Sequence, residues 1–205
     1  MAVTTAFRPS LQEPASFTEQ NWPPQGKWTY DDYCRLPDDG MTYEIIEGEL
    51  HMAPAPIPMH QDSSAEMITA FRNFSKQHNV GKAFVAPIDV ILPGVAEPVQ
   101  PDVLLIVKER LHIVKPTRIE GAPDIIVEVL SPSNWNIDRG KKFRAYAKAG
   151  VREYWIVDPQ ARTIELFVLR EHAYHLIDNY GVGATVRSEV LPGFEVKVEE
   201  VCPSV

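Results

Sequence analysis

Three short apolar segments limit most strongly what this chain can fold into. They span residues 103–107, 125–130 and 153–157, and they consist mainly of aliphatic and aromatic side chains. Continuous apolar runs of this length are typical of strands that are buried on both faces, and such a sheet needs helices to cover it. The chain is therefore expected to have a mixed α/β fold.

The segments around these strands supply the covering helices. Residues 60–77 predict one helix, and residues 136–149 predict another that ends at Gly150, a residue suited to the left-handed conformation. A further strand is expected over residues 83–92. The central order is then helix, strand, strand, strand, helix, strand.

Strand patterns also flank this core. An N-terminal hairpin is expected to turn at Glu47 and Gly48, and β-rich stretches predict a C-terminal meander over residues 163–169, 173–178 and 184–199. Residues 1–27 are rich in Pro, Gln, Ser and Thr and lack apolar periodicity, which indicates a poorly ordered tail. Residues 28–205 are expected to form a single domain.

Several functional classes are disfavoured by composition. No apolar run approaches the length of a membrane span, and the first residues lack the pattern of a secretory signal, so a cytoplasmic protein without membrane contact is expected. Cys34 and Cys202 are far apart and have no neighbouring Cys or His at zinc-ligand spacing, which argues against a zinc knot or a disulfide framework.

The net charge of -8 argues against non-specific coating of nucleic acid, because that binding depends on Lys and Arg side chains that neutralise phosphates. Carboxylates gathered around a divalent cation also count as negative, although they attract the ion that a phosphate substrate needs. The distribution of charge is therefore more informative than its total.

Strand pairing brings two acids together. If the strands at 103–107 and 125–130 pair antiparallel through the connection between them, Asp102 lies opposite residue 129 or within one or two residues of it. The carboxylates of Asp102 and Glu128 then reach the same end of the sheet and can share one cation. Glu128 is surrounded in sequence by apolar residues, where burial is costly unless the carboxylate is paired or bound to metal.

Asp124 also follows a proline and has the same strand parity as Glu128. Four residues of strand advance about 13 Å, which is too far for both acids to hold a single ion. Asp124 is therefore expected to begin or cap its strand.

The helix over residues 136–149 has a row at spacing four, formed by Asp138, Lys142 and Tyr146. The helix leaves the strand just after Glu128, so the long side chain of Lys142 can return towards the carboxylates. Lys141 takes this place if the helix phase differs by one residue. Tyr146 is expected to be a core aromatic or an accessory site residue.

The same helix has a second, basic row that is suited to phosphate contacts, or that is simply solvated. Its members are Arg139, Lys141, Arg144 and Lys148. Three residues upstream of the strands, Glu44, Glu49 and His60, are candidates for a further metal ligand or a proton acceptor, although a hairpin acid or a capping histidine explains them equally well.

Carboxylates and a lysine suit hydrolysis of a phosphodiester. A divalent ion neutralises charge on the non-bridging oxygens and lowers the pKa of bound water, while an ammonium positions the water or stabilises the transition state. Hard oxygen ligands favour Mg²⁺, with Mn²⁺ as the alternative.

The chain resembles the Uma2-type (DUF820) family of restriction-endonuclease-like proteins, within the PD-(D/E)XK nuclease superfamily, over about residues 28–200. The resemblance is carried by residues 43–50, Pro101-Asp102-Val103, residues 121–129, Ser131-Pro132-Ser133, Asp138 through Lys142 to Tyr146, and residues 150–159. It implies the nuclease core fold, with Asp102 and Glu128 as the acids of its two elements. The superfamily lysine normally stands two residues after the second acid, where this chain has Leu130, so the resemblance implies that Lys142 replaces it from the helix.

The leading hypothesis is a Mg²⁺-dependent DNA endonuclease. The alternative is a catalytically inactive protein that keeps the nuclease fold and binds nucleic acid or serves assembly. RNA or a branched structure as substrate also stays open. The β-rich C-terminal segment and the sheet edges suit a homodimer, which would match cleavage of both strands of a duplex.

Overall fold

The computed structural model describes residues 21–131 and 135–203. The predicted tail up to residue 20, and Pro132 and Ser133 of the segment that carries the family resemblance, lie outside this range. Residues 21–27, which the sequence places in the same tail, contact the hairpin: the Gly26 N–H donates a hydrogen bond to the Gly48 carbonyl at 2.8 Å, and Trp22 stacks on Trp28. This part of the expected tail is attached to the domain.

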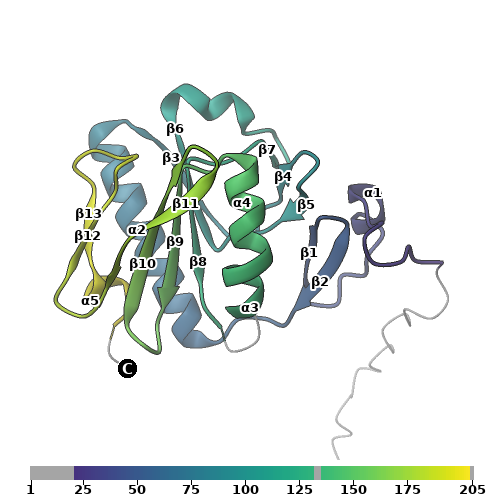
Figure 1. Ribbon diagram of the computed structural model, residues 1–205, viewed down its shortest axis with the longest axis horizontal. Helices are drawn as coiled ribbons and strands as arrows, with labels where there is room; N and C mark the ends of the chain where they lie inside the picture. Colours follow the sequence, from purple (N-terminus) through teal and green to yellow (C-terminus); the bar gives the residue numbers. More distant parts are fainter. Residues whose placement is uncertain (1–20, 132–134, 204–205) are drawn as a thin grey trace, which may run out of the picture.

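A six-stranded mixed sheet forms the centre of the molecule (Figure 1). Only β8 and β9 are parallel neighbours, and every other adjacent pair is antiparallel. In spatial order its strands are β11 (Ala173–Tyr180), β10 (Thr163–Arg170), β9 (Glu153–Asp158), β8 (Ile125–Val129), β6 (Val103–Val107) and β3 (Gly81–Val85). The expected mixed α/β class is confirmed, as is the order of helices and strands in the core.

Helices cover both faces of this sheet (Figure 1). The long helix α2 (Pro58–His78) packs on one face, where Met67 and Phe71 join a core with Val127 and Trp155. The other face is covered by a continuous helical segment that consists of α3 (Trp135–Ile137), a π-helical turn (Asp138–Lys142) and α4 (Phe143–Ala149).

The alternation of side chains along β8 decides which face holds the candidate acid. Ile125, Val127 and Val129 belong to the core under α2, whereas Ile126 belongs to the core under α4. Because successive strand residues point to opposite faces, Glu128 lies on the α4 side with Ile126.

A smaller five-stranded sheet packs beside α4 and carries the N-terminal hairpin. Its strands in spatial order are β2 (Glu49–Ala53), β1 (Thr42–Ile46), β5 (Ala96–Val99), β4 (Val90–Leu92) and β7 (Ile119–Glu120). The hairpin turns at Glu47 and Gly48 as expected, and both residues have positive φ. A Cβ at Gly48 would lie 2.7 Å from the Gly26 carbonyl oxygen, so the close approach of the two segments requires glycine here.

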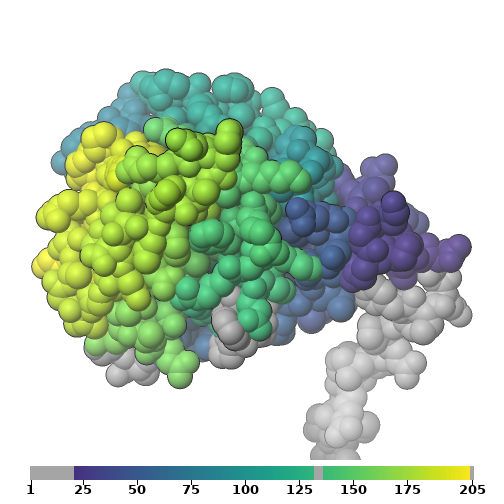
Figure 2. Space-filling view, viewed as in Figure 1, coloured from purple at the N-terminus to yellow at the C-terminus, as the bar shows by residue number. Residues whose placement is uncertain are grey.

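The short peripheral elements complete the chain. A one-turn helix α1 (Tyr30–Tyr33) lies beside the small sheet, and a 3₁₀ helix (Lys108–Ile113) connects β6 to β7. The C-terminal pair β12 (Thr185–Arg187) and β13 (Glu195–Lys197) leads into α5 (Val198–Val201), which packs against α2. Figure 2 shows these C-terminal residues and the small sheet with α1 at opposite ends of one body. No helix in the described ranges is long and apolar enough to cross a membrane.

Two sequence expectations about strands are wrong. The single strand predicted over residues 83–92 is two strands, β3 and β4, which belong to different sheets. Pro87 lies between them, and a proline lacks the N–H that a continuous ladder needs. Residues 184–199 are likewise two short strands followed by the start of α5 rather than one β-rich stretch.

Candidate active site

The two predicted acids meet at the end of the central sheet. Val103 of β6 pairs with Val127 of β8, so continuing this register by one residue places Asp102 beside Glu128. The sequence predicts residue 129, or a residue within one or two positions of it, and the observed register lies within this range. The Val129 N–H donates a hydrogen bond to Asp102 Oδ2 at 2.7 Å, which fixes the Asp102 carboxylate against the edge of β8.

Glu128 is almost fully buried and has two donors on one oxygen. Lys142 Nζ lies 3.1 Å from Glu128 Oε1, and the Tyr146 hydroxyl donates to the same oxygen at 2.6 Å. Burial raises the pKa of Glu128 well above its ordinary value, while the neighbouring ammonium of Lys142 opposes that rise. Tyr146, expected as a core aromatic or an accessory residue, is both buried and bonded to the site.

Lys142 lies at the centre of the cluster. Its ammonium is 3.0 Å from Glu44 Oε2, 3.1 Å from Glu128 Oε1 and 3.5 Å from Asp138 Oδ1, and the residue is only 4% exposed. Burial by itself lowers the pKa of Lys142, but the surrounding carboxylates outweigh burial and raise the pKa well above its ordinary value. Lys142 therefore stays charged.

The helix phase selects Lys142 over its neighbour. Lys141 points outwards and forms an ion pair with Glu49 of the hairpin. The π-helical turn from Asp138 to Lys142 lies in the segment that faces the sheet end, and π turns inside α-helices frequently occur at functional sites.

Asp138 is a site residue that the predicted set leaves out. It is buried, and its carboxylate faces Lys142. Burial raises the pKa of Asp138 to about 6, against the lowering effect of Lys142. Asp138 Oδ1 accepts no hydrogen bond within the described ranges. The helical spacing of four residues between Asp138 and Lys142 indicates that both side chains lie on the same side of the helix, and this pattern identifies Asp138 as a neighbour of the acids.

Glu44 joins the cluster from β1 of the small sheet. Its Oε2 contacts Lys142, and its Oε1 accepts a hydrogen bond from the Gln100 N–H at 2.7 Å. The side-chain amide of Gln100 in turn donates hydrogen bonds to Asp89 Oδ1 and to the Tyr33 hydroxyl oxygen. No local sequence pattern identifies Gln100, because its position depends on how the small sheet assembles.

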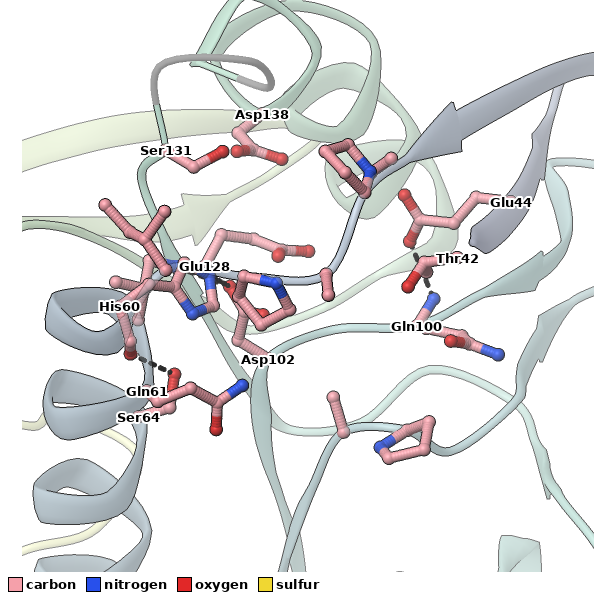
Figure 3. A pocket seen from close by; sticks show the side chains of 18 of the residues that line it. Thr42, Glu44, His60, Gln61, Ser64, Gln100, Asp102, Glu128, Ser131 and Asp138 are labelled. Carbon is pink, nitrogen blue, oxygen red and sulfur yellow. Dashed lines mark hydrogen bonds and ion pairs between the residues drawn. The ribbon is translucent and has the colours of Figure 1, made fainter. Parts of the chain in front are cut away.

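His60 approaches Asp102 from the first turn of α2 (Figure 3). His60 Nε2 is 3.1 Å from Asp102 Oδ2. Burial lowers the pKa of His60, but the hydrogen bond and the charge of Asp102 outweigh burial and raise the pKa above its ordinary value. Figure 3 shows Glu44 approaching from the opposite side, with Asp138, Glu128 and Asp102 between the two.

Two of the accessory candidates lie outside this cluster. Asp124 is buried at the other end of β8, where it accepts a hydrogen bond from the Val107 N–H and forms an ion pair with Arg110 at 2.8 Å. This agrees with the expectation that Asp124 begins its strand. Glu49 is paired with Lys141 on the outer side of the hairpin.

The basic residues of the helix do not form a free positive strip. Arg139 forms an ion pair with Glu165 at 2.7 Å, Lys141 pairs with Glu49, and Lys148 lies 3.9 Å from Glu47. Arg144 is exposed. Acids from both sheets therefore compensate most of the charge that the sequence pattern suggests.

The cluster lines a cavity of about 410 Å³ (Figure 3). Its polar lining residues include Glu44, Asp102, Glu128, Asp138 and Lys142, and its apolar lining residues come from two loops and include Pro54, Pro56, Ile57 and Pro87. The acids are thus reached through an opening rather than displayed on a flat surface.

The donor chemistry of this cavity suits a hard divalent cation. Three carboxylates contact one lysine, and Asp138 Oδ1, 3.5 Å from the Lys142 ammonium, is buried without a hydrogen bond within the described ranges, which leaves it available as an oxygen ligand. Within the described ranges no three His, Cys, Asp or Glu side chains are arranged to surround a metal ion. The Lys142 ammonium instead lies between Glu44, Glu128 and Asp138 and balances part of their charge.

The chain matches one protein family and is similar in fold to a solved structure. A model of the family Uma2, described as "Putative restriction endonuclease", matches residues 30–199. Comparison with curated proteins gave no match. Among solved structures, the chain is similar to the crystal structure of a putative nuclease belonging to DUF820 from Anabaena variabilis ATCC 29413. The TM-score is 0.68 at 21% identity, with 85% of this chain and 97% of that chain covered, which confirms the shared fold.

Proposed function

The chain belongs to the Uma2 family of putative restriction endonucleases, and from this premise we propose that it is a metal-dependent DNA endonuclease. The observation that carries the proposal is the pairing of Asp102 with Glu128 at the end of the sheet, beside the buried ammonium of Lys142. Two acids and a lysine around one cavity are the groups that phosphodiester hydrolysis requires.

In this proposal Asp102 and Glu128 would hold Mg²⁺, or Mn²⁺ in its place, through their carboxylate oxygens. The bound ion would neutralise charge on the non-bridging phosphate oxygens and make a bound water more acidic. In the overall reaction a water oxygen bonds to phosphorus, the bond from phosphorus to the leaving oxygen breaks, and the leaving oxygen takes up a proton. One product carries a terminal phosphate and the other a hydroxyl.

Lys142 acts as a hydrogen-bond donor in this scheme, because its raised pKa keeps it charged and unable to accept a proton. It orients the attacking water and stabilises negative charge that develops on the phosphate. Glu44 and Asp138 hold the ammonium in place, and Tyr146 holds the Glu128 carboxylate. His60 does the same for Asp102.

A second candidate function, binding of nucleic acid without cleavage, is favoured by the ion pairs of Lys142. The Lys142 ammonium already compensates Glu44, Glu128 and Asp138, so the cluster also satisfies the requirements of a stable buried ion pair without a metal. A protein of this kind would keep the nuclease fold and bind nucleic acid without cutting it.

A nicking assay separates the two candidates. Supercoiled plasmid, in which superhelical strain opens short unpaired segments, is expected to be nicked when it is incubated with the protein and Mg²⁺, and Glu128→Gln or Lys142→Ala is expected to abolish nicking. Glu66→Gln and Lys76→Ala are matched controls, because both residues are exposed on α2 away from the cavity. Nicking that persists in both site variants would reject the proposed site. A gel shift without cleavage by the wild-type protein would favour the inactive binder.

A further inference from the structure

We infer that the substrate is an unpaired DNA strand, and that two successive nucleotides occupy two adjoining cavities at the end of the central sheet. This inference deepens the proposed function and rests on it for the chemistry. It concerns the class of DNA that the site accepts, which neither the family description nor the acid cluster specifies.

A second cavity adjoins the one that contains the acids. Its volume is about 580 Å³, and the first cavity measures about 410 Å³, so each falls within the range of about 300–1,000 Å³ typical of small-molecule sites. Ile57, His60 and Ser131 line both cavities and form the wall between them. The acid Asp102, which contacts His60, lies next to this shared wall.

Apolar side chains line part of both cavities. Pro54, Pro56, Ile57 and Pro87 line the first cavity, and the second is lined by Ile57, Met59, Leu130 and Pro159. Apolar side chains of this kind suit the faces of a nucleobase that has left its stack. The acids line the first cavity next to the shared wall, so a phosphate held there with one unpaired base in each cavity matches a dinucleotide step of a single strand.

The charge around the cavities argues against a duplex. Lys142 is the only Lys or Arg among the described residues that line either cavity. Duplex binding depends on several such side chains along the phosphate backbone, whereas Arg139, Lys141 and Lys148 are directed to acids. An unpaired strand can instead gain its affinity from burial of its bases.

The burial of the site residues also favours an unpaired strand as the substrate. Glu128 is 2% exposed and Lys142 is 4% exposed, so a phosphate has to enter the cavity to reach them. The bases of a duplex are stacked and paired, and a nucleotide enters a pocket only after the cost of unstacking has been met. A single strand avoids most of that cost.

Fluorescence anisotropy tests the inference without relying on turnover. A short labelled single-stranded oligodeoxynucleotide and the duplex of the same sequence are titrated with the protein in Ca²⁺, an ion that also takes oxygen ligands. The single strand is expected to bind at least about tenfold more tightly, since removal of the apolar faces of one base from water contributes that much. Equal or tighter binding of the duplex would overturn the inference.

Ile57→Asp is the diagnostic variant, because Ile57 lines both cavities and is about half exposed. Ile57 is also the N-cap residue of α2, a position that favours Asp, so the variant is expected to fold. It should weaken single-strand binding about tenfold. Val182→Asp is the control, since Val182 is similarly exposed and lines neither cavity. Unchanged binding by folded Ile57→Asp would reject the two-cavity site.

Cleavage assays separate this inference from the proposed function. Cutting of duplex and single strand at the same rate would reject the inference and leave the nuclease intact. Preferential binding of the single strand without any cleavage would reject the nuclease and leave the binding site intact. A strand of RNA that binds while the DNA strand does not would overturn the assignment to DNA.

Discussion

Lys142 and Glu128 are in direct contact inside the protein, with 3.1 Å between Nζ and Oε1. Glu128 comes from a strand and Lys142 from the π-helical turn that follows it, and both are buried. The same ammonium also contacts Glu44 and Asp138, so the Lys142 side chain connects carboxylates from the central sheet, the small sheet and the helix. The stability of the fold and the chemistry of the site therefore depend on the same side chain.

Removal of the Lys142 ammonium is expected to destabilise the protein. Lys142→Met leaves three buried carboxylates without their ammonium partner, and loss of one member of a buried ion pair typically costs about 3–5 kcal/mol. Urea denaturation measures the free energy of unfolding, with Lys76→Met as the control on the exposed face of α2. Addition of Mg²⁺ should recover part of the loss, because a divalent ion can compensate the same acids. Equal stability of the two variants would contradict a central role for Lys142.

Asp138 predicts a pH dependence of stability. Burial raises the pKa of Asp138 from 3.8 to about 6, so the folded protein binds a proton there more strongly than the unfolded chain does. The resulting stabilisation is complete below about pH 3.8 and is lost as the pH rises through about 6. A shift of this size corresponds to at most about 3 kcal/mol.

Asp138→Asn removes this titration. The variant is expected to lose less stability than the wild type between pH 4 and pH 7. Thermal unfolding followed across this range checks the difference. Parallel curves for the two proteins would show that Asp138 has an ordinary pKa in the folded state.

Much of the site follows from patterns that are local in the sequence. The antiparallel pairing of the strands that contain Val103 and Val127 predicts that Asp102 and Glu128 reach the same end of the sheet, because consecutive strands usually lie side by side. The sequence predicts the register only to within one or two residues, since periodicity alone does not fix how two strands align. Helical spacing similarly predicts that Lys142 faces the acids.

The rest depends on contacts between distant segments. Glu44 and Gln100 reach the site through the small sheet, where β5 has four residues and β7 only two, too short to show a period. Helical spacing also places Arg139 and Lys148 on the surface, but it cannot reveal that Glu165 and Glu47 lie opposite them. Pairing partners are set by tertiary packing, which local propensity does not contain.

The exposed guanidinium of Arg144 is the best test of a nucleic-acid contact on the helix. Arg144→Ala is expected to weaken DNA binding and to reduce its salt dependence by about one counterion, if Arg144 contacts a phosphate. Arg139→Ala should have a smaller effect, because Arg139 is engaged by Glu165. Fluorescence anisotropy titrations at several salt concentrations give, for each variant, the slope of the logarithm of the binding constant against the logarithm of the salt concentration. A larger effect for Arg139 would mean that its ion pair opens when DNA binds.

Tyr146 is expected to position Glu128 without taking part in bond making. Tyr146→Phe removes the hydroxyl that donates to Glu128 Oε1 at 2.6 Å, which should lower the free energy of unfolding by about 1–3 kcal/mol and reduce the nicking rate. Tyr174→Phe is the matched control, because the Tyr174 hydroxyl donates to the Val151 carbonyl at 2.9 Å, away from the acids. The control should lose similar stability and keep its nicking rate. If both variants lose nicking activity in proportion to their loss of stability, the hydrogen bond between Tyr146 and Glu128 serves the fold alone. A loss of nicking activity in Tyr146→Phe but not in Tyr174→Phe assigns the Tyr146 hydroxyl to orientation of the Glu128 carboxylate.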